Sequence, residues 1–299
     1  EESIGQGGNT SCDRRSQSRN QETVALFLGG PRGGEYERMN DDHSTGSRKG
    51  ARRPFPKYRQ TVLDIVRQSQ KIPSFPIVRR MNLANVANAR KVSSPNIGWT
   101  AIVAKAHAIV CQKTPELREV FVAYPSKHLY RHPHCVASVS VHRLDDEGHA
   151  RLIWGRLENP ESTTLVQLQS QLDYFRTAPM KSAYREGLIL EGRSAMVRRI
   201  AWWWVMNCSG RKRAKHVGTF SISSLGAQGS LNAHHPLITT TSLAIGPIAS
   251  NGQCDMVLIC DHRTLDGMLA AEALQSLEAV LCNQVVEELS QPNFRVDAA

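Results

Sequence analysis

Residues 256–267 read Met-Val-Leu-Ile-Cys-Asp-His-Arg-Thr-Leu-Asp-Gly and join an apolar run to a polar turn. The run MVLIC is typical of a buried strand, and the residues after the turn, MLAAEALQSLEAVL, have the apolar spacing of a helix. His262 is thereby placed at the rim of a sheet, where reacting groups are commonly found. Asp266 falls near the helix N-terminus, where free N–H groups and the helix dipole favour a carboxylate. The spacing leaves two interpretations open, a helix-capping arrangement with a satisfied histidine or a reactive site.

Outward from this stretch, the chain alternates helical and extended patterns. Apolar spacing predicts helices at 58–70, 99–111, 163–177, 194–207 and 266–283. Alternating or β-branched runs predict strands at 75–83, 134–142, 151–155, 217–224, 240–245 and 255–260. Mixed elements with long spacings indicate an α/β sandwich rather than parallel βαβ repeats.

The first part of the chain differs in composition from the rest. Residues 1–54 are rich in Gly, Ser, Arg, Asn and Asp, so they cannot bury enough apolar surface to offset chain entropy. We therefore expect a disordered N-terminal segment, residues 1–54, and a folded domain, residues 55–299. The net charge of +10 arises almost entirely in the folded part. The chain begins with Glu rather than Met, which is compatible with a piece of a longer protein.

Four stretches of the chain resemble segments of one enzyme family, two of them closely. Residues 261–267, DHRTLDG, match the DHRxxDG signature of the catalytic domain of 2-oxo acid dehydrogenase acyltransferases, the dihydrolipoamide acyltransferase family, and share HxxxDG with chloramphenicol acetyltransferase. Residues 218–226, GTFSISSLG, resemble that family's GxFTISNLG segment. Tyr58-Arg59 with the later IPSFP, and KTPEL at 113–117, are similar to its opening MRRxIAxR … IPHF stretch and its VPELN turn. The resemblance covers about residues 55–290.

The resemblance implies a fold and an assembly. It predicts a chloramphenicol acetyltransferase-like, two-layer α/β sandwich in which helices flank a mixed sheet, with residues 55–299 as an acyltransferase catalytic domain. It also implies a homotrimer whose active sites lie between two subunits, so that His262 faces the Ser223 region of a neighbouring copy.

The same resemblance implies roles for individual residues. His262 is the general base, and Ser223 is the serine that stabilises the oxyanion, with Ser221 and Ser224 as neighbours one or two positions away. Asp266 is an orienting residue that holds the catalytic loop through an arginine, for which Arg59 is the candidate. The structural support of the turn includes two further residues, Arg263 and Gly267.

The implied reaction is acyl transfer to a thiol, hydroxyl or amine acceptor. No tightly bound cofactor is expected, because the donor is itself the substrate: a coenzyme A thioester, a lipoyl group or a carrier-protein thioester. Family members carry a lipoyl domain and a subunit-binding domain, for which residues 1–54 are too short and too polar. We therefore expect a stand-alone catalytic domain that meets acyl-coenzyme A, an acyl carrier or a separate lipoyl domain. The alternative is a non-catalytic trimeric scaffold or assembly module of the same fold.

Residues 195–216 combine three adjacent tryptophans, Trp202–Trp204, with the basic cluster Arg211–Lys215. Neighbours on a helix are about 100° apart, so at least one tryptophan should approach the surface or a cavity. Aromatic and basic residues together suit an anionic membrane surface, an acidic carrier protein or the phosphates of coenzyme A. Core tryptophans followed by a solvated basic loop would produce the same pattern.

Metal and nucleic-acid sites have little support in the sequence. Among the 11 histidines, His132 and His134 could share a strand face but lack a clear third ligand, so no metal site is predicted. His234 and His235 follow the GTFSISSLG segment and are candidates for the substrate channel. The seven cysteines form no CxxC pair and are expected to be reduced and mostly buried. No nucleic-acid motif accompanies the charge. A cytoplasmic location is expected, with an organelle or a membrane surface as alternatives.

Overall fold

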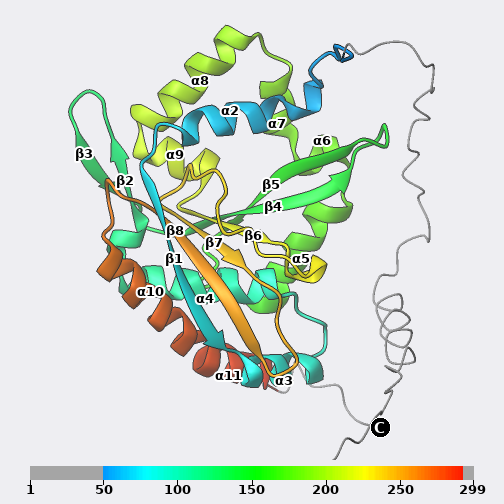
Figure 1. Cartoon of the computed structure of the whole chain (residues 1–299), viewed down its shortest axis with the longest axis vertical. Helices are drawn as coiled ribbons and strands as arrows, with labels where there is room; N and C mark the ends of the chain where they lie inside the picture. The colour runs from blue at the N-terminus through cyan, green and yellow to red at the C-terminus, as the bar shows by residue number, and fades with distance from the viewer. Residues whose placement is uncertain (1–49, 292–299) are drawn as a thin grey trace, which may run out of the picture. The chain divides into compact units, whose positions relative to one another are not determined.

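The computed structural model describes residues 50–291. The prediction that residues 1–54 are disordered therefore falls almost entirely outside the described residues. Short elements begin the described part: the 3-10 helix η1 (Lys57–Arg59) leads directly into α2 (Gln60–Ser69). A proline-containing stretch then turns the chain into the first strand (Figure 1).

A mixed six-stranded sheet forms the centre of the domain. Its spatial order is β1 (Ser74–Asn82), β8 (Gln253–Asp261), β7 (Thr241–Ile245), β6 (Phe220–Ser224), β4 (Val136–Leu144) and β5 (Ala150–Glu158). The pairs β4–β6 and β6–β7 are parallel and the other three are antiparallel. A separate hairpin pairs β2 (Glu119–Val122) with β3 (His128–Arg131). The sheet thus confirms the predicted α/β architecture.

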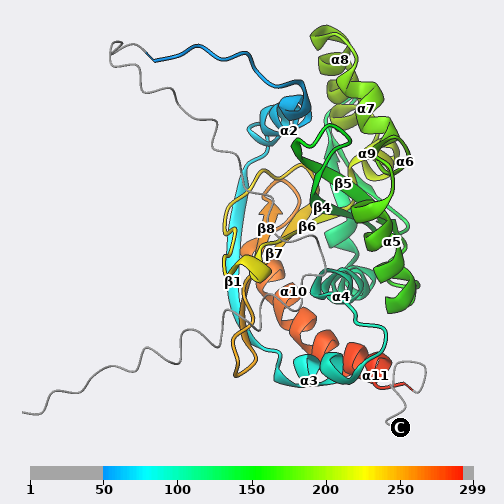
Figure 2. The ribbon, with the colours of Figure 1, turned by 90° about the vertical axis from the view of Figure 1, so that its right-hand side faces the viewer.

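One face of the sheet carries the main apolar core. Side chains alternate along a strand, so Phe220 and Ile222 of β6 point to one face, while Ser221 and Ser223 point to the other. The core face packs against a helical layer (Figure 2). Its helices are α3 (Ala84–Val92), α4 (Trp99–Lys113), α5 (Leu165–Thr177), α10 (Gly267–Val280) and α11 (Val286–Leu289). A π-helical segment, η4 (Leu281–Val285), joins the last two helices.

The opposite face is partly covered by α2 and by a helical insertion between β5 and β6. The insertion contains α6 (Met180–Ala183), α7 (Arg185–Glu191), α8 (Ala195–Asn207) and α9 (Gly210–Val217). Arg198 of α8 is buried and donates to the Asp64 carboxylate of α2 over 2.9 Å and to the carbonyl of Arg193 over 2.7 Å. Separating a buried ion pair leaves a charge without a partner in the interior, which is strongly destabilising. This contact therefore holds α8 against α2.

The predicted elements agree with the structure, with ends that differ by a few residues. The helices expected at 58–70, 99–111, 163–177 and 194–207 are α2, α4, α5 and α8, and every predicted strand is present in the sheet. The sequence patterns did not predict the hairpin β2–β3 or the short helices α3, α6, α7, α9 and α11. The six described cysteines are free, and four of them are buried, as expected.

Candidate functional site

The turn between β8 and α10 is built around a buried carboxylate. Asp261 is fully buried, and it accepts hydrogen bonds from Arg263 through the guanidinium Nε over 2.9 Å, through a second guanidinium nitrogen over 2.6 Å and through the backbone N–H over 3.0 Å. The N–H groups of Thr264 and Leu265 donate to the Asp261 carbonyl. Arg263 therefore ties the turn to Asp261, the first residue of the motif.

A second arginine lies behind the turn and was missed in the sequence. Arg213 of α9 is fully buried and donates to the carbonyls of Ile238 and Phe121. Burial lowers the pKa of Arg213 to about 10, although the nearby Asp261 carboxylate opposes the change. The sequence places Arg213 in a basic cluster that would be exposed in a solvated loop. The structure corrects this, because α9 turns the Arg213 side chain toward the sheet and away from solvent.

His262 projects from the turn with one ring nitrogen already engaged. Nδ1 lies 3.0 Å from the carbonyl oxygen of Leu265, and the ring meets Phe75 edge-on at 4.7 Å between centroids. A carbonyl can only accept, so Nδ1 is the protonated nitrogen in this contact, and in the neutral imidazole Nε2 is the nitrogen that keeps its lone pair. The side chain is 57% exposed. The neutral ring would therefore present Nε2, without a proton, at the surface of this chain.

Asp266 and Arg59 do not form the expected pair within the chain. Asp266 begins α10 as its N-cap without a side-chain capping bond, is 89% exposed, and places Oδ1 3.8 Å from Nδ1 of His262. The backbone N–H of His262 donates to the carbonyl of Pro73, at the end of the segment that follows α2. Arg59 precedes the first residue of α2, a ten-residue helix about 15 Å long, whereas Pro73 lies beyond its last residue. The length of α2 thus separates the two side chains.

Gly267 has no steric requirement for glycine in the single chain, because an added Cβ would meet no atom within 4 Å. Gly218, the first residue of the GTFSISSLG segment, differs. It has φ +102°, and a Cβ there would lie 2.9 Å from the Val136 carbonyl oxygen. The glycine is therefore needed where α9 ends and the chain enters the sheet beside β4.

Ser223 lies on the sheet face that carries polar side chains. Ser138 and Ser140 of β4, Ser221 and Ser223 of β6, and Ser242 of β7 all line one small cavity of about 160 Å³. Ser221 donates to Ser242 over 2.6 Å, and Ser140 donates to the Ile222 carbonyl. In the described part of the chain, the hydroxyl of Ser223 has no hydrogen-bond partner. This hydroxyl is therefore available to a ligand in the cavity.

Within one chain, Ser223 and His262 are far apart. Ser223 is in register with Ala244 of β7, and Ala244 with Val257 of β8. Two strand spacings amount to about 10 Å, and His262 lies five residues beyond Val257, about 16 Å along the strand. No reacting group could contact both side chains of the same copy.

His235 is the histidine that lines the Ser223 cavity. Its Nε2 lies 2.5 Å from the Ser242 hydroxyl, and its Nδ1 faces the Asn232 carbonyl at 3.4 Å. Burial lowers the pKa of His235, so the ring is neutral near pH 7, and Nε2 accepts a hydrogen bond from Ser242. His234 is exposed and does not line this cavity. Of the two predicted channel histidines, the structure brings one to the cavity.

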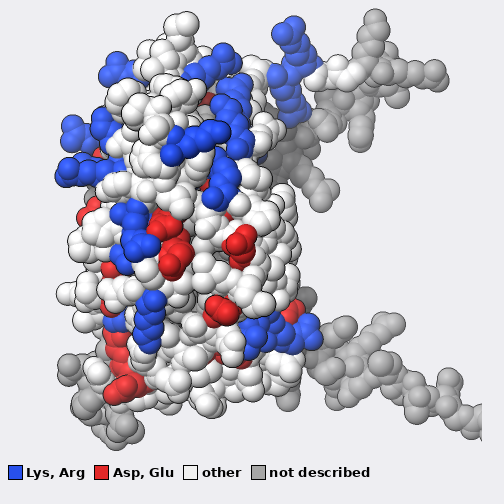
Figure 3. Space-filling model, turned by 90° about the vertical axis from the view of Figure 1, so that its left-hand side faces the viewer, with Lys and Arg blue, Asp and Glu red and all other residues white. Residues whose placement is uncertain are grey.

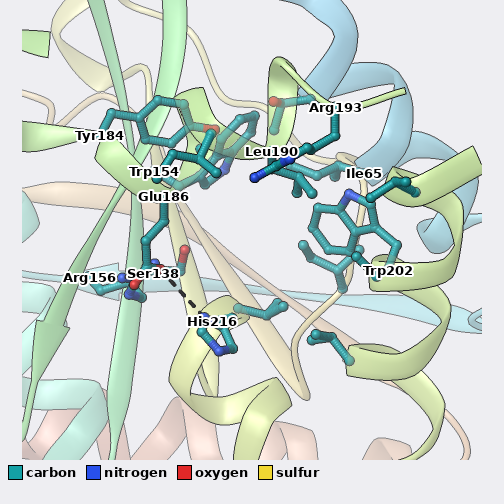
Figure 4. A pocket seen from close by; sticks show the side chains of 18 residues that line it. Ile65, Ser138, Trp154, Arg156, Tyr184, Glu186, Leu190, Arg193, Trp202 and His216 are labelled. Carbon is teal, nitrogen blue, oxygen red and sulfur yellow. Dashed lines mark hydrogen bonds and ion pairs between the residues drawn. The ribbon is translucent and has the colours of Figure 1, made fainter. Parts of the chain in front are cut away.

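A larger cavity of about 520 Å³, which Figure 4 shows, shares lining residues with the Ser223 cavity. Five residues line both spaces: Ile65, Ser138, Trp154, Val217 and Ile238. The larger space lies among α2, the strands β4 and β5, and the helices α7 and α8. The two cavities therefore meet on the polar face of the sheet.

The tryptophan segment is divided between two surfaces. Trp202 lines the larger cavity, whereas Trp203 and Trp204 are 41% and 48% exposed. This confirms that the three rings cannot share one face. The exposed Lys212 places its ammonium 5.4 Å from the ring centre of Trp204. A membrane contact of this segment stays a prediction.

One group of potential metal ligands lies within residues 50–291. Asp145, Glu147 and His149 place their ligand atoms within 4.8 Å of one another. The group occupies the turn between β4 and β5, where an Asp145 carboxylate oxygen accepts the N–H groups of Glu147 and His149. Over the same residues, no helix combines the length and apolar character needed to cross a membrane.

Comparisons with known proteins give the fold. No family model and no curated protein matches the sequence. A probable dihydrolipoamide acetyltransferase from Listeria monocytogenes superimposes with a TM-score of 0.56 at 19% identity, over 82% of this chain and 97% of that chain. The dihydrolipoamide acetyltransferase of Azotobacter vinelandii gives 0.57 at 16% identity, over 79% and 93%. A truncated 2-oxoacid dehydrogenase complex core from Thermoplasma acidophilum gives 0.58 at 14% identity, over 78% and 99%.

Proposed function

We propose that this chain, which has the fold of dihydrolipoamide acetyltransferase catalytic cores, is an acyltransferase that uses His262 as its general base and Ser223 as its oxyanion donor. The observation that carries the proposal is the 3.0 Å contact between Nδ1 of His262 and the carbonyl oxygen of Leu265. The hydrogen bond from Nδ1 to Leu265 leaves Nε2 free to accept a proton. The Azotobacter enzyme has been investigated for the catalytic roles of a serine, a histidine and an asparagine four residues after that histidine. His262 and Asp266 have the same separation.

In the proposed reaction, Nε2 of His262 removes the proton from an acceptor thiol, hydroxyl or amine. The acceptor atom attacks the thioester carbonyl carbon and forms a new bond, and the carbonyl oxygen becomes negatively charged. The Ser223 hydroxyl donates to this oxygen. The tetrahedral intermediate then collapses, the carbon–sulfur bond breaks, and the His262 proton passes to the leaving thiolate. Atoms and charge balance without a further reactant.

The proposed site needs two copies of the chain, because Ser223 and His262 are too far apart in one. A homotrimer with sites between neighbours meets this need. The proposed donor is a coenzyme A thioester, a carrier-protein thioester or an acylated lipoyl domain. The neighbours that superimpose include dihydrolipoamide acetyltransferases, which favours a lipoyl-type thiol as the first acceptor to test.

The test is thiol release from acetyl-coenzyme A and longer acyl-coenzyme A, with dihydrolipoamide as the acceptor. His262→Ala is expected to lower turnover by about 10² to 10⁴, the usual contribution of a general base. Ser223→Ala is expected to lower turnover by about 10² to 10³. Ser224→Ala is the matched control, because this exposed hydroxyl follows Ser223 but points to the other face of the strand.

Two outcomes would count against the proposal. Near-normal turnover of His262→Ala would refute the mechanism. Binding of the donor without transfer to any acceptor, in a folded wild-type protein, would favour the alternative, a non-catalytic scaffold or assembly module.

A further inference from the structure

The larger cavity beside Ser223 has walls that are mostly apolar. Ile65 of α2, Trp154 of β5 and Leu190 of α7 surround it, and Ala201, Trp202 and Val205 of α8 close one side (Figure 4). Its volume of about 520 Å³ falls in the range of about 300 to 1,000 Å³ that is usual for small-molecule sites. An apolar space of this size favours a ligand with a hydrocarbon part, because binding removes the apolar surface of that part from water.

The charged groups of the cavity are mostly engaged with one another. Glu186 accepts from Arg156 over 3.0 Å and lies 3.4 Å from Nδ1 of His216. Burial alone would raise the pKa of Glu186, but the charges and hydrogen bonds of Arg156 and His216 outweigh it and lower the pKa. Glu186 is therefore ionised and paired near pH 7. Arg193, which is exposed, borders the cavity and can extend into solvent. These groups leave the interior without an unpaired charge to bind a polar ligand.

The cavity borders a smaller space at the proposed reaction centre, with which it shares lining residues. The Ser223 cavity is about 160 Å³, which is below the usual size for a compact ligand. Ser138 and Trp154 line both cavities, so a group that starts at Ser223 passes these two residues to reach the larger space. A thin, extended group fits this path better than a ring system.

We propose that the two adjoining cavities together hold the hydrocarbon chain of a medium- or long-chain acyl group, with the thioester carbonyl at Ser223. The inference rests on the proposed acyl transfer and names its substrate class. Burying each CH₂ contributes about 0.8 kcal/mol, which corresponds to an affinity gain of about fourfold per added carbon until the cavity is filled. A short acyl group such as acetyl would leave the larger cavity unused.

Binding of thioether analogues tests the proposal without turnover. S-ethyl, S-octyl and S-dodecyl N-acetylcysteamine cannot be cleaved as thioesters, and they need no coenzyme A site. Calorimetry on the full chain is expected to show an affinity for the octyl probe at least about 10²-fold above that for the ethyl probe. Quenching or a shift of tryptophan fluorescence provides a second readout, because Trp154 and Trp202 line the cavity.

A pair of variants on α8 locates the bound chain. Ala201→Trp fills the cavity from its α8 wall and is expected to abolish the preference for the octyl probe. Ile200→Trp is the matched control, because Ile200 is 61% exposed and is absent from the cavity lining. Val205→Phe replaces Ala201→Trp if the latter fails to fold, as judged by circular dichroism.

The outcomes separate this inference from the proposed function. Equal affinity for all probes, or equal loss in Ala201→Trp and Ile200→Trp, would overturn the chain-binding inference even if His262-dependent transfer from acetyl-coenzyme A is present. Chain-dependent binding without His262-dependent transfer from any donor would refute the acyl-transfer assignment instead. Transfer that is faster from octanoyl than from acetyl thioesters, and that loses this preference in Ala201→Trp, would support both.

Discussion

His107 of α4 shows how a single buried side chain links stability to pH. The ring is fully buried, with Nε2 at 3.2 Å from the Thr241 hydroxyl and an edge-on contact to Phe220. In the described part of the chain, Nδ1 has no hydrogen-bond partner. Burial lowers the pKa of His107 to about 3, so the folded protein keeps this ring neutral. His107 lines neither of the two cavities beside Ser223, so it belongs to the core rather than to the candidate site.

His107 is expected to make the fold sensitive to acid. The ring binds a proton near pH 6.5 in the unfolded chain but only near pH 3 in the folded chain. The free energy of unfolding is therefore highest above pH 6.5 and falls as the pH is lowered from 6.5 to about 3, because only the unfolded chain gains a proton in that range. When the pH is lowered from about 8 to about 5, this ring should reduce the free energy of unfolding by about 2 kcal/mol. His107→Gln should lack that loss in urea titrations. His142→Gln, at an exposed site, is the control, and equal pH slopes in all three proteins would contradict the prediction.

Helix α8 is the element that separates two apolar surfaces. Its inner face lines the larger cavity, and its outer face exposes Met196, Ile200, Trp203 and Trp204. On the face that Figure 3 shows, Lys and Arg gather toward the upper end, where α8 and α9 lie, whereas Asp and Glu lie in the middle and toward the lower end. Exposed cations on these helices include Arg199, Arg211 and Lys215. An apolar helix face with basic neighbours has the character of a surface that binds anionic lipid.

The outer face of α8 is therefore predicted to bind anionic vesicles. The double variant Met196→Glu, Ile200→Glu should reduce co-sedimentation with phosphatidylserine vesicles by at least about tenfold. It removes two apolar side chains that the membrane would bury, and it adds two negative charges that the anionic lipid repels. Val92→Glu on α3 is the control at another exposed apolar residue. Unchanged co-sedimentation of the double variant, or none of the wild type, would contradict the prediction.

At the scale of the whole molecule, the proposed site is divided between copies. Neither His262 nor Ser223 is buried by its own chain, and about 10 Å across the sheet and about 16 Å along it separate them. A closed ring of identical subunits would bring His262 of one copy to Ser223 of the next in every interface.

This division predicts complementation between inactive variants. His262→Ala and Ser223→Ala chains, unfolded together and refolded as a mixture, should recover about one quarter of wild-type activity, because each interface needs an intact His262 from one copy and an intact Ser223 from the other. Each variant refolded alone is the control. A mixture no more active than the separate variants would show that the two residues do not act across an interface. Light scattering on the wild type measures the expected trimer.

The sequence by itself determined the six strands of the main sheet, the long helices and the turn that carries His262, because these depend on local patterns. The apolar run before His262 and the apolar spacing after it are visible in the chain, and DHRTLDG contains both Asp261 and Arg263. Only the tertiary structure decided what packs behind the turn. Arg213 comes from a basic stretch with no apolar pattern, yet α9 buries it near Asp261. The cavity beside Ser223 likewise depends on α2, β5, α7 and α8, which are distant in sequence, so only long-range packing brings them together.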